Sequence, residues 1–129
     1  MGNGGSAATA SHFANDLSIG TNSYHKPMRA LAITDNQAVI TAIANDFGYL
    51  GISASGNSPN LLRAFEAARE MGIKTIALTA FDGGQMKSMA DEGIHVPTDP
   101  KEYGPAEDAH MVLDHLVGAY LIQRIKRGG

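Results

Sequence analysis

The sequence predicts an α/β fold with three layers, in which helices cover both faces of a parallel sheet. Short apolar segments typical of buried strands alternate with segments in which apolar residues recur at helical spacing. Two turns rich in glycine and serine each lead into a helix, which is common where strands and helices alternate. With 129 residues and 43% hydrophobic content, we expect residues 1–129 to form a single compact domain.

The expected elements follow one another regularly along the chain. They are a helix over 6–17 with Ser6 as its N-cap, a strand over 30–33, a helix over about 37–44, the end of a strand at 50–52, a helix over 59–71, a strand over 73–79, a helix over 85–92, a strand over 93–96 and a long helix from Pro105. Gly72 is expected to end the helix that begins at Pro59.

The stretch Gly51-Ile-Ser-Ala-Ser-Gly-Asn-Ser-Pro59 has the composition of a phosphate-binding turn. The hydroxyls of Ser53, Ser55 and Ser58 and the free N–H groups of the following helix could all donate to phosphate oxygens. Taken by itself, a tight serine-rich turn with an ordinary helix cap explains these residues equally well.

A second loop, Gly2-Asn-Gly-Gly-Ser6, also leads into a helix and favours an anion site. Neither loop matches the Gly-x-Gly-x-x-Gly pattern with a downstream acidic residue or the Gly-x-x-x-x-Gly-Lys pattern. A dinucleotide site and a P-loop are therefore not expected.

Two pairs of polar residues are candidates for chemistry in the first half of the chain. His12 and Asp16 lie four residues apart and share one helix face, which suits two ligands of one metal ion or an acid and a base. A surface His–Asp pair is the alternative. Asp35 and Asn36 follow a predicted strand, where open α/β sheets bind ligands, although helix capping also explains them.

The last helix is apolar around much of its circumference, so we expect it to be buried in the domain or against another subunit. Its polar residues are then unexpected, because a buried charge needs a partner. They are Glu107, Asp108, His110, Asp114 and His115. Alternatively, they mark a solvent-facing side near the N-terminal end of the helix, where its dipole favours acids.

Composition excludes several classes of function. A formal net charge of -3 does not favour nucleic acid or an anionic membrane surface as a partner. The chain has no cysteine, which excludes disulfides, a thiolate nucleophile and thiolate metal ligands. No apolar run approaches the roughly 20 residues that span a bilayer, and we predict a soluble, cytoplasmic protein.

Five motifs occur in this sequence in the order that is typical of one protein family. They are Gly2-Asn-Gly-Gly-Ser-Ala7, His12-Phe-Ala14, Asn45-Asp-Phe-Gly-Tyr49, Gly51-Ile-Ser-Ala-Ser-Gly-Asn-Ser58, and Thr75-Ile-Ala-Leu-Thr79 through Asp82-Gly-Gly84. Together they resemble the sugar isomerase (SIS) domain of the phosphoheptose isomerase type, over almost the whole chain. The resemblance implies a flavodoxin-like SIS fold. It also implies isomerisation of sedoheptulose 7-phosphate to D-glycero-D-manno-heptose 7-phosphate through an enediol.

The resemblance also implies roles for particular residues. Asp16 would be the catalytic base and His115 the partner acid. Zinc or another divalent metal ion would be held by His12, Asp16, Glu107 and His115. The substrate would be bound by Asn3, Gly4, Gly5, Ser6, Asp35, Asn36, Ser53, Ala54, Ser55, Ser58 and Glu107. The chain would assemble as a homo-oligomer, with a tetramer expected.

The chain departs from the resembled pattern at several points. Asp16 stands where the family has glutamate, and Glu107 where it has glutamine. Glu107 and His115 are also separated by roughly 12 Å of helical rise. The resembled domains have further elements before the first glycine loop and between Tyr49 and Leu50, and we expect those segments to have been left out here. These departures keep open a second function, a non-catalytic SIS module that binds a sugar phosphate and regulates a partner protein.

Overall fold

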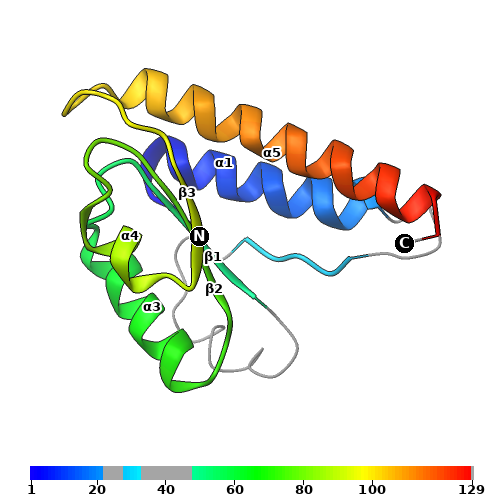
Figure 1. Ribbon diagram of the computed structural model, residues 1–129, viewed down its shortest axis with the longest axis horizontal. Helices are drawn as coiled ribbons and strands as arrows, with labels where there is room; N and C mark the ends of the chain where they lie inside the picture. Colours follow the sequence, from blue (N-terminus) through cyan, green and yellow to red (C-terminus); the bar gives the residue numbers. More distant parts are fainter. Residues whose placement is uncertain (22–27, 33–47, 129) are drawn as a thin grey trace.

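A parallel sheet forms the centre of the protein in the computed structural model, which describes residues 1–21, 28–32 and 48–128 (Figure 1). Within the described residues the sheet has three strands, which lie in chain order, and both neighbouring pairs are parallel. They are β1 (Tyr49–Ser53), β2 (Thr75–Thr79) and β3 (Glu92–His95). Gly2 adds one parallel bridge to Ile52, which places the N-terminal loop beside the carboxyl end of β1.

Helices cover both faces of this sheet (Figure 1). α3 (Pro59–Glu70) and α4 (Gly84–Met89) lie on one face. On the other face, α1 (Gly4–Asn15), continued by the π-helical turn η1 (Asp16–Gly20), lies beside the long α5 (Tyr103–Lys126). The predicted three-layer α/β fold is therefore confirmed.

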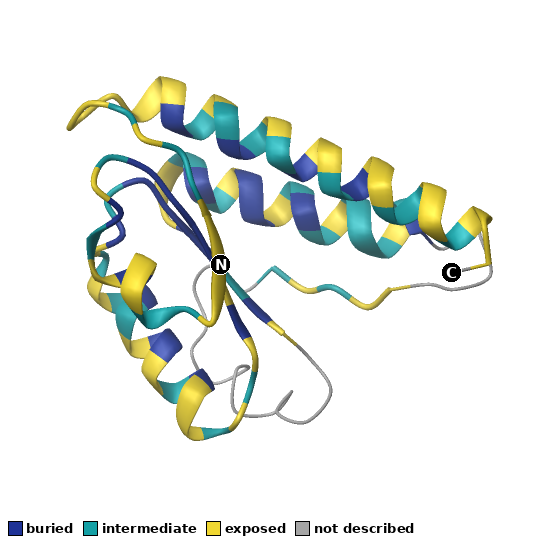
Figure 2. Cartoon of the chain, viewed as in Figure 1, coloured by how far each residue is buried: buried dark blue, intermediate teal, exposed yellow. Residues whose placement is uncertain are grey.

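The core is divided by the sheet because successive strand residues face opposite sides. Tyr49 packs with Phe65 of α3, and their rings meet edge to face with centroids 5.0 Å apart. Ile52 and Leu78 belong to the apolar cluster on the opposite side, with Phe13 of α1. Figure 2 shows buried residues along both layers of helices where they face the strands. This packing fixes α1 and α5 against the sheet, and these two helices carry the candidate site.

One predicted strand is wrong within the described residues. Residues 28–32 form no strand, because the backbone of Ala30 is bound by a side chain instead of a neighbouring strand. The Ser18 hydroxyl donates to the Ala30 carbonyl oxygen and accepts from its N–H, both at 3.0 Å. Residue 33 and the predicted helix over 37–44 lie outside the described residues.

The predicted cap of the first helix is also wrong. α1 begins at Gly4 after Asn3, and Ser6 is a buried residue of its first turn. The chain turns earlier than expected because Gly4 takes a positive φ of 52° and Gly2 packs directly on the Ser6 carbonyl. Ser58 does precede α3 as predicted, although its side chain forms no cap hydrogen bond.

The predicted site of the omitted segment, between Tyr49 and Leu50, lies inside a strand. Both residues belong to β1, and the Tyr49 N–H donates to the Lys74 carbonyl oxygen at 2.8 Å. The expected omission of a segment there stays a prediction. Within the part of the chain that the structure describes, no helix combines the length and apolar character needed to cross a membrane.

Candidate functional site

The serine turn after β1 is held closed by its own hydroxyls. The Ser53 hydroxyl accepts from the Gly56 N–H at 3.1 Å and lies 3.3 Å from the Ser58 hydroxyl. Ser55 accepts from the Asn57 N–H at 3.3 Å. Ser53 is buried, whereas Ser55 in the turn and Ser58 at the N-cap of α3 are half-buried. The two half-buried hydroxyls are therefore better placed than Ser53 to contact a ligand.

The turn is braced from the side of α4. The Gln85 N–H donates to the Asn57 side-chain oxygen at 3.0 Å, and the Met86 N–H donates to the Gly56 carbonyl at 2.9 Å. Gly56 has a positive φ of 64°, a conformation that glycine adopts readily. The serine turn thus has a defined shape before any ligand binds.

The N-terminal glycine loop and the serine turn are joined. The side-chain amides of Asn3 and Asn60 donate to each other reciprocally, at 2.9 Å in each direction. Gly2 is bridged to Ile52, so Gly4 and Gly5 begin α1 close to the carboxyl end of β1. The buried Ala54 follows β1 directly. The two predicted anion-binding segments therefore belong to one region, at the strand ends where α/β folds bind ligands.

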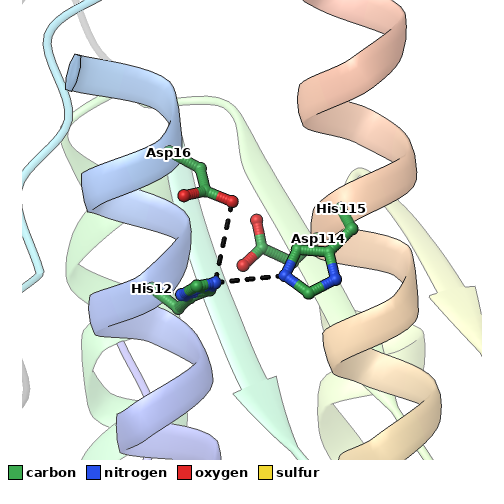
Figure 3. A group of neighbouring side chains, drawn as sticks. All are labelled: His12, Asp16, Asp114 and His115. Atoms are coloured by element: carbon green, nitrogen blue, oxygen red, sulfur yellow. Dashed lines mark hydrogen bonds and ion pairs between the residues drawn. The ribbon is translucent and has the colours of Figure 1, made fainter. Parts of the chain in front are cut away.

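A polar cluster lies where α5 faces α1 and the start of η1 (Figure 3). The Nε2 atom of His12 lies 3.1 Å from the Nε2 atom of His115 and 3.8 Å from a carboxylate oxygen of Asp16. Asp114 completes the group, with one ligand atom from each of the four residues within 4.8 Å of the others. The structure therefore brings together three of the four predicted metal ligands.

The fourth predicted ligand lies elsewhere. Glu107 is near the start of α5, and a methyl group added to Gly5 would overlap its carboxylate. Because Glu107 lies about two turns before His115, the helix directs it to the glycine loop and not to the histidines. Glu107 thus faces the predicted substrate loop, and Asp114 occupies the position beside His12, Asp16 and His115. Asp35 and Asn36 lie outside the described residues.

The environment of Asp114 is unfavourable for a lone carboxylate. Its side chain is fully buried, and neither oxygen has a hydrogen-bond partner among the described residues. Burial raises the pKa of the Asp114 carboxyl, and the Asp16 carboxylate raises it further, while His12 and His115 act in the opposite direction. A cation beside Asp114 would relieve this cost.

A second buried polar residue, His110, lies on α5 between Glu107 and the cluster. Its Nε2 atom is 3.2 Å from the Thr79 carbonyl oxygen, and its Nδ1 atom has no partner in the described structure. The Thr79 hydroxyl in turn lies 3.1 Å from Nδ1 of His95. Burial lowers the pKa of His110, against smaller opposing effects of Thr79 and Glu107. His110 therefore ties α5 to the end of β2 through the Thr79 carbonyl.

The cluster has the composition of a divalent metal site. Two imidazoles and two carboxylates suit zinc or another borderline divalent ion. The buried, unpartnered oxygens of Asp114 fit this chemistry, since coordination would satisfy them. The sequence carried one signal for Asp114, a charged residue within the apolar run Val112-Leu-Asp-His-Leu-Val117.

Comparison with known proteins agrees with the fold. The family model described as SIS domain matches residues 1–116. The phosphoheptose isomerase of Akkermansia muciniphila is 39% identical over 99% of this chain and 76% of its own length. That of Helicobacter pylori strain Shi470 is 37% identical over 90% of this chain and 69% of its own. The phosphoheptose isomerase structure from Francisella tularensis superimposes with a TM-score of 0.75 at 28% identity, covering 95% of this chain and 74% of that one. The chain therefore belongs to the SIS domain family.

Proposed function

We propose that this protein is a ketose–aldose isomerase that converts sedoheptulose 7-phosphate to D-glycero-D-manno-heptose 7-phosphate. The observation that carries the proposal is the meeting of a carboxylate and two imidazoles, from His12, Asp16 and His115, between two helices of an SIS domain. Similar proteins named phosphoheptose isomerase support the choice of reaction.

The substrate phosphate binds at the serine turn. Ser55 and Ser58 contact it through half-buried hydroxyls, together with backbone N–H groups at the start of α3. Ser53 and Ala54 hold the turn in shape. The glycine loop contributes Asn3, Gly4, Gly5 and Ser6, and Glu107 lies against this loop. The Asn3–Asn60 amide pair supports the proposal, because it joins the two segments that must contact one ligand.

Isomerisation moves hydrogen within the substrate and needs no external oxidant or reductant. The Asp16 carboxylate removes a proton from the carbon next to the carbonyl, while His115 donates one to the carbonyl oxygen, which forms an enediol. A proton then returns to the former carbonyl carbon, and the neighbouring hydroxyl loses its own to become the new carbonyl. The proximity of Asp16 and His115 supports this pairing of base and acid.

Zinc, or another divalent ion, is the proposed cofactor. His12, Asp16 and His115 would hold it, and when bound it would polarise substrate oxygens as a Lewis acid. The donor set of the cluster supports this choice.

A homo-oligomer, with a tetramer expected, is the proposed assembly. Val112, Leu116 and Tyr120 recur every four residues along α5 and are 56%, 60% and 59% exposed. Such an apolar stripe on a helix favours contact with another subunit. A cytoplasmic location remains a prediction from the sequence.

Exchange of solvent deuterium into sedoheptulose 7-phosphate tests the proposed reaction, because exchange reports proton abstraction directly. We expect the zinc-loaded protein to exchange deuterium into the substrate and to form the aldose. Binding of the sugar phosphate without exchange, with or without zinc, would instead favour a non-catalytic SIS module that regulates a partner. This second function is suggested by two departures from the resembled pattern, Asp16 in place of glutamate and Glu107 in place of glutamine.

A further inference from the structure

We infer that Asp114 is a carboxylate ligand of the metal ion and takes the place that the family resemblance gives to Glu107. This inference rests on the metal ion of the proposed function, and it concerns a residue that the resemblance leaves unassigned. It follows from the burial of Asp114, its neighbours and the direction of Glu107.

Asp114 is buried without a hydrogen-bond partner among the described residues. The side chain has no exposed surface, and both carboxylate oxygens lack a hydrogen-bond partner in the described structure. Leaving a buried polar group unpaired is costly, and a buried carboxylate is the more costly case. Such a group is retained where it binds something, and a cation is the ligand that suits a carboxylate.

Asp114 lies among other side chains that can bind a metal ion. His12, Asp16 and His115 all place a ligand atom within 4.8 Å of the Asp114 carboxylate. Figure 3 shows this carboxylate between the helices, on the side of α5 that faces α1. Two carboxylates so close together repel each other unless a cation lies between them. Bound to a divalent ion, the two carboxylates and two imidazoles form a neutral site.

Glu107 lies at the glycine loop and not in the cluster. Its carboxylate lies against Gly5, where even a methyl group would overlap it. Roughly 12 Å of helical rise separates residue 107 from residue 115, whereas Asp114 is adjacent to His115 in the chain. Glu107 therefore contacts the glycine loop, and Asp114 supplies the second carboxylate of the metal site, beside Asp16.

Zinc binding to the metal-stripped, full-length protein tests the assignment without reference to catalysis. We expect Asp114→Asn, which keeps the size of the side chain, to weaken zinc binding about 100-fold or more in calorimetric titration. Glu107→Gln should change zinc affinity by less than about threefold. Asp108→Asn, an exposed position on the same helix, provides the matched control. Cobalt in place of zinc adds a spectroscopic readout, since losing a carboxylate ligand should alter its visible absorption.

The possible results separate the assignment from the proposed reaction. Zinc binding lost in Asp114→Asn and kept in Glu107→Gln supports the assignment even if the protein exchanges no deuterium into the sugar. The reverse pattern, or a wild-type protein that binds no zinc, overturns it. Thermal unfolding of the metal-free variants checks their folding, and Asp114→Ala serves as a second variant with the same expected loss of affinity.

Discussion

The Nε2 atoms of His12 and His115 lie 3.1 Å apart, across the contact between α1 and α5. In the absence of metal, a hydrogen bond between these two nitrogens needs one ring to donate and the other to accept. Two nitrogen ligands of a tetrahedral zinc ion lie about 3.3 Å apart, because each bond is about 2.0–2.1 Å long. The pair is therefore already close to the separation that a shared metal ion requires.

Asp16→Asn and His115→Ala should each lower turnover of sedoheptulose 7-phosphate by about 100-fold or more, with a modest change in affinity. The reason is that an enediol mechanism needs two proton-transfer groups, and each variant removes one of them. Steady-state kinetics and solvent deuterium exchange should fall in parallel. Asp108→Asn makes the same chemical change at an exposed position of α5 and should leave turnover unchanged. Wild-type turnover in either site variant would show that the assigned group takes no part in proton transfer.

Ser55→Ala and Ser58→Ala should weaken binding of the sugar phosphate and leave binding of the free sugar nearly unchanged. Each removes a half-buried hydroxyl of the turn that leads into α3, where a bound phosphate would also meet the helix N–H groups. Calorimetry with sedoheptulose 7-phosphate and with sedoheptulose measures the difference. Ser88→Ala, at an exposed position on α4, is the control. An equal loss for both ligands would mean that the turn contacts the sugar and not its phosphate.

Much of the fold follows from sequence periodicity, because local patterns decide which segments are strands and which are helices. The run ending at Thr79 is β-branched and apolar, and it forms β2 as expected. The predicted strand at 30–33 shows the limit of this reasoning. Its backbone is bound by Ser18, a contact twelve residues away that no local pattern encodes.

From the sequence, residues of the candidate site could be predicted to lie close together only where they belong to the same helix. His12 and Asp16 are close because they lie four apart on one helix. Which residues of α5 meet them depends on how that helix packs on α1, and its apolar residues surround most of its circumference. From the sequence alone, it could not be decided whether Asp114 or Glu107 faces His12 and Asp16. The packing of the two helices places Asp114 beside them and Glu107 against the glycine loop.

Removing the ionisable group of His110 should flatten the dependence of stability on pH. Burial lowers the pKa of His110 in the folded protein, so the unfolded chain takes up a proton first as the pH falls below about 6.5. The contribution of His110 to the free energy of unfolding is then fully present above that pH. Below it, this contribution falls by at most about 1.4 kcal/mol per pH unit. Glu107 and His95 act on the same ring in opposite directions.

Urea unfolding of the wild type and of His110→Gln at pH 8, 7, 6 and 5 measures this dependence. Glutamine keeps an N–H donor for the Thr79 carbonyl, and the difference at pH 8 gives the cost of altered packing alone. We expect that difference to shrink as the pH falls, because only the wild type loses stability through this residue. A constant difference from pH 8 to pH 5 would show that His110 binds protons equally in both states.

Gly56→Ala should destabilise the protein more than Gly72→Ala, although both glycines have nearly the same backbone conformation. Their φ angles are 64° and 71°, so alanine at either position costs about 1–2 kcal/mol in the left-handed region. A methyl group at Gly72 meets open space, whereas at Gly56 it overlaps the Gly83 carbonyl oxygen. Relieving that overlap must move the serine turn away from α4, at a further cost of about 1–3 kcal/mol.

Urea unfolding should therefore show a larger loss of stability for Gly56→Ala than for Gly72→Ala, and only Gly56→Ala should also weaken binding of sedoheptulose 7-phosphate. Equal stability losses, with phosphate binding kept in both variants, would mean that the turn adapts freely and that its shape does not determine the phosphate site.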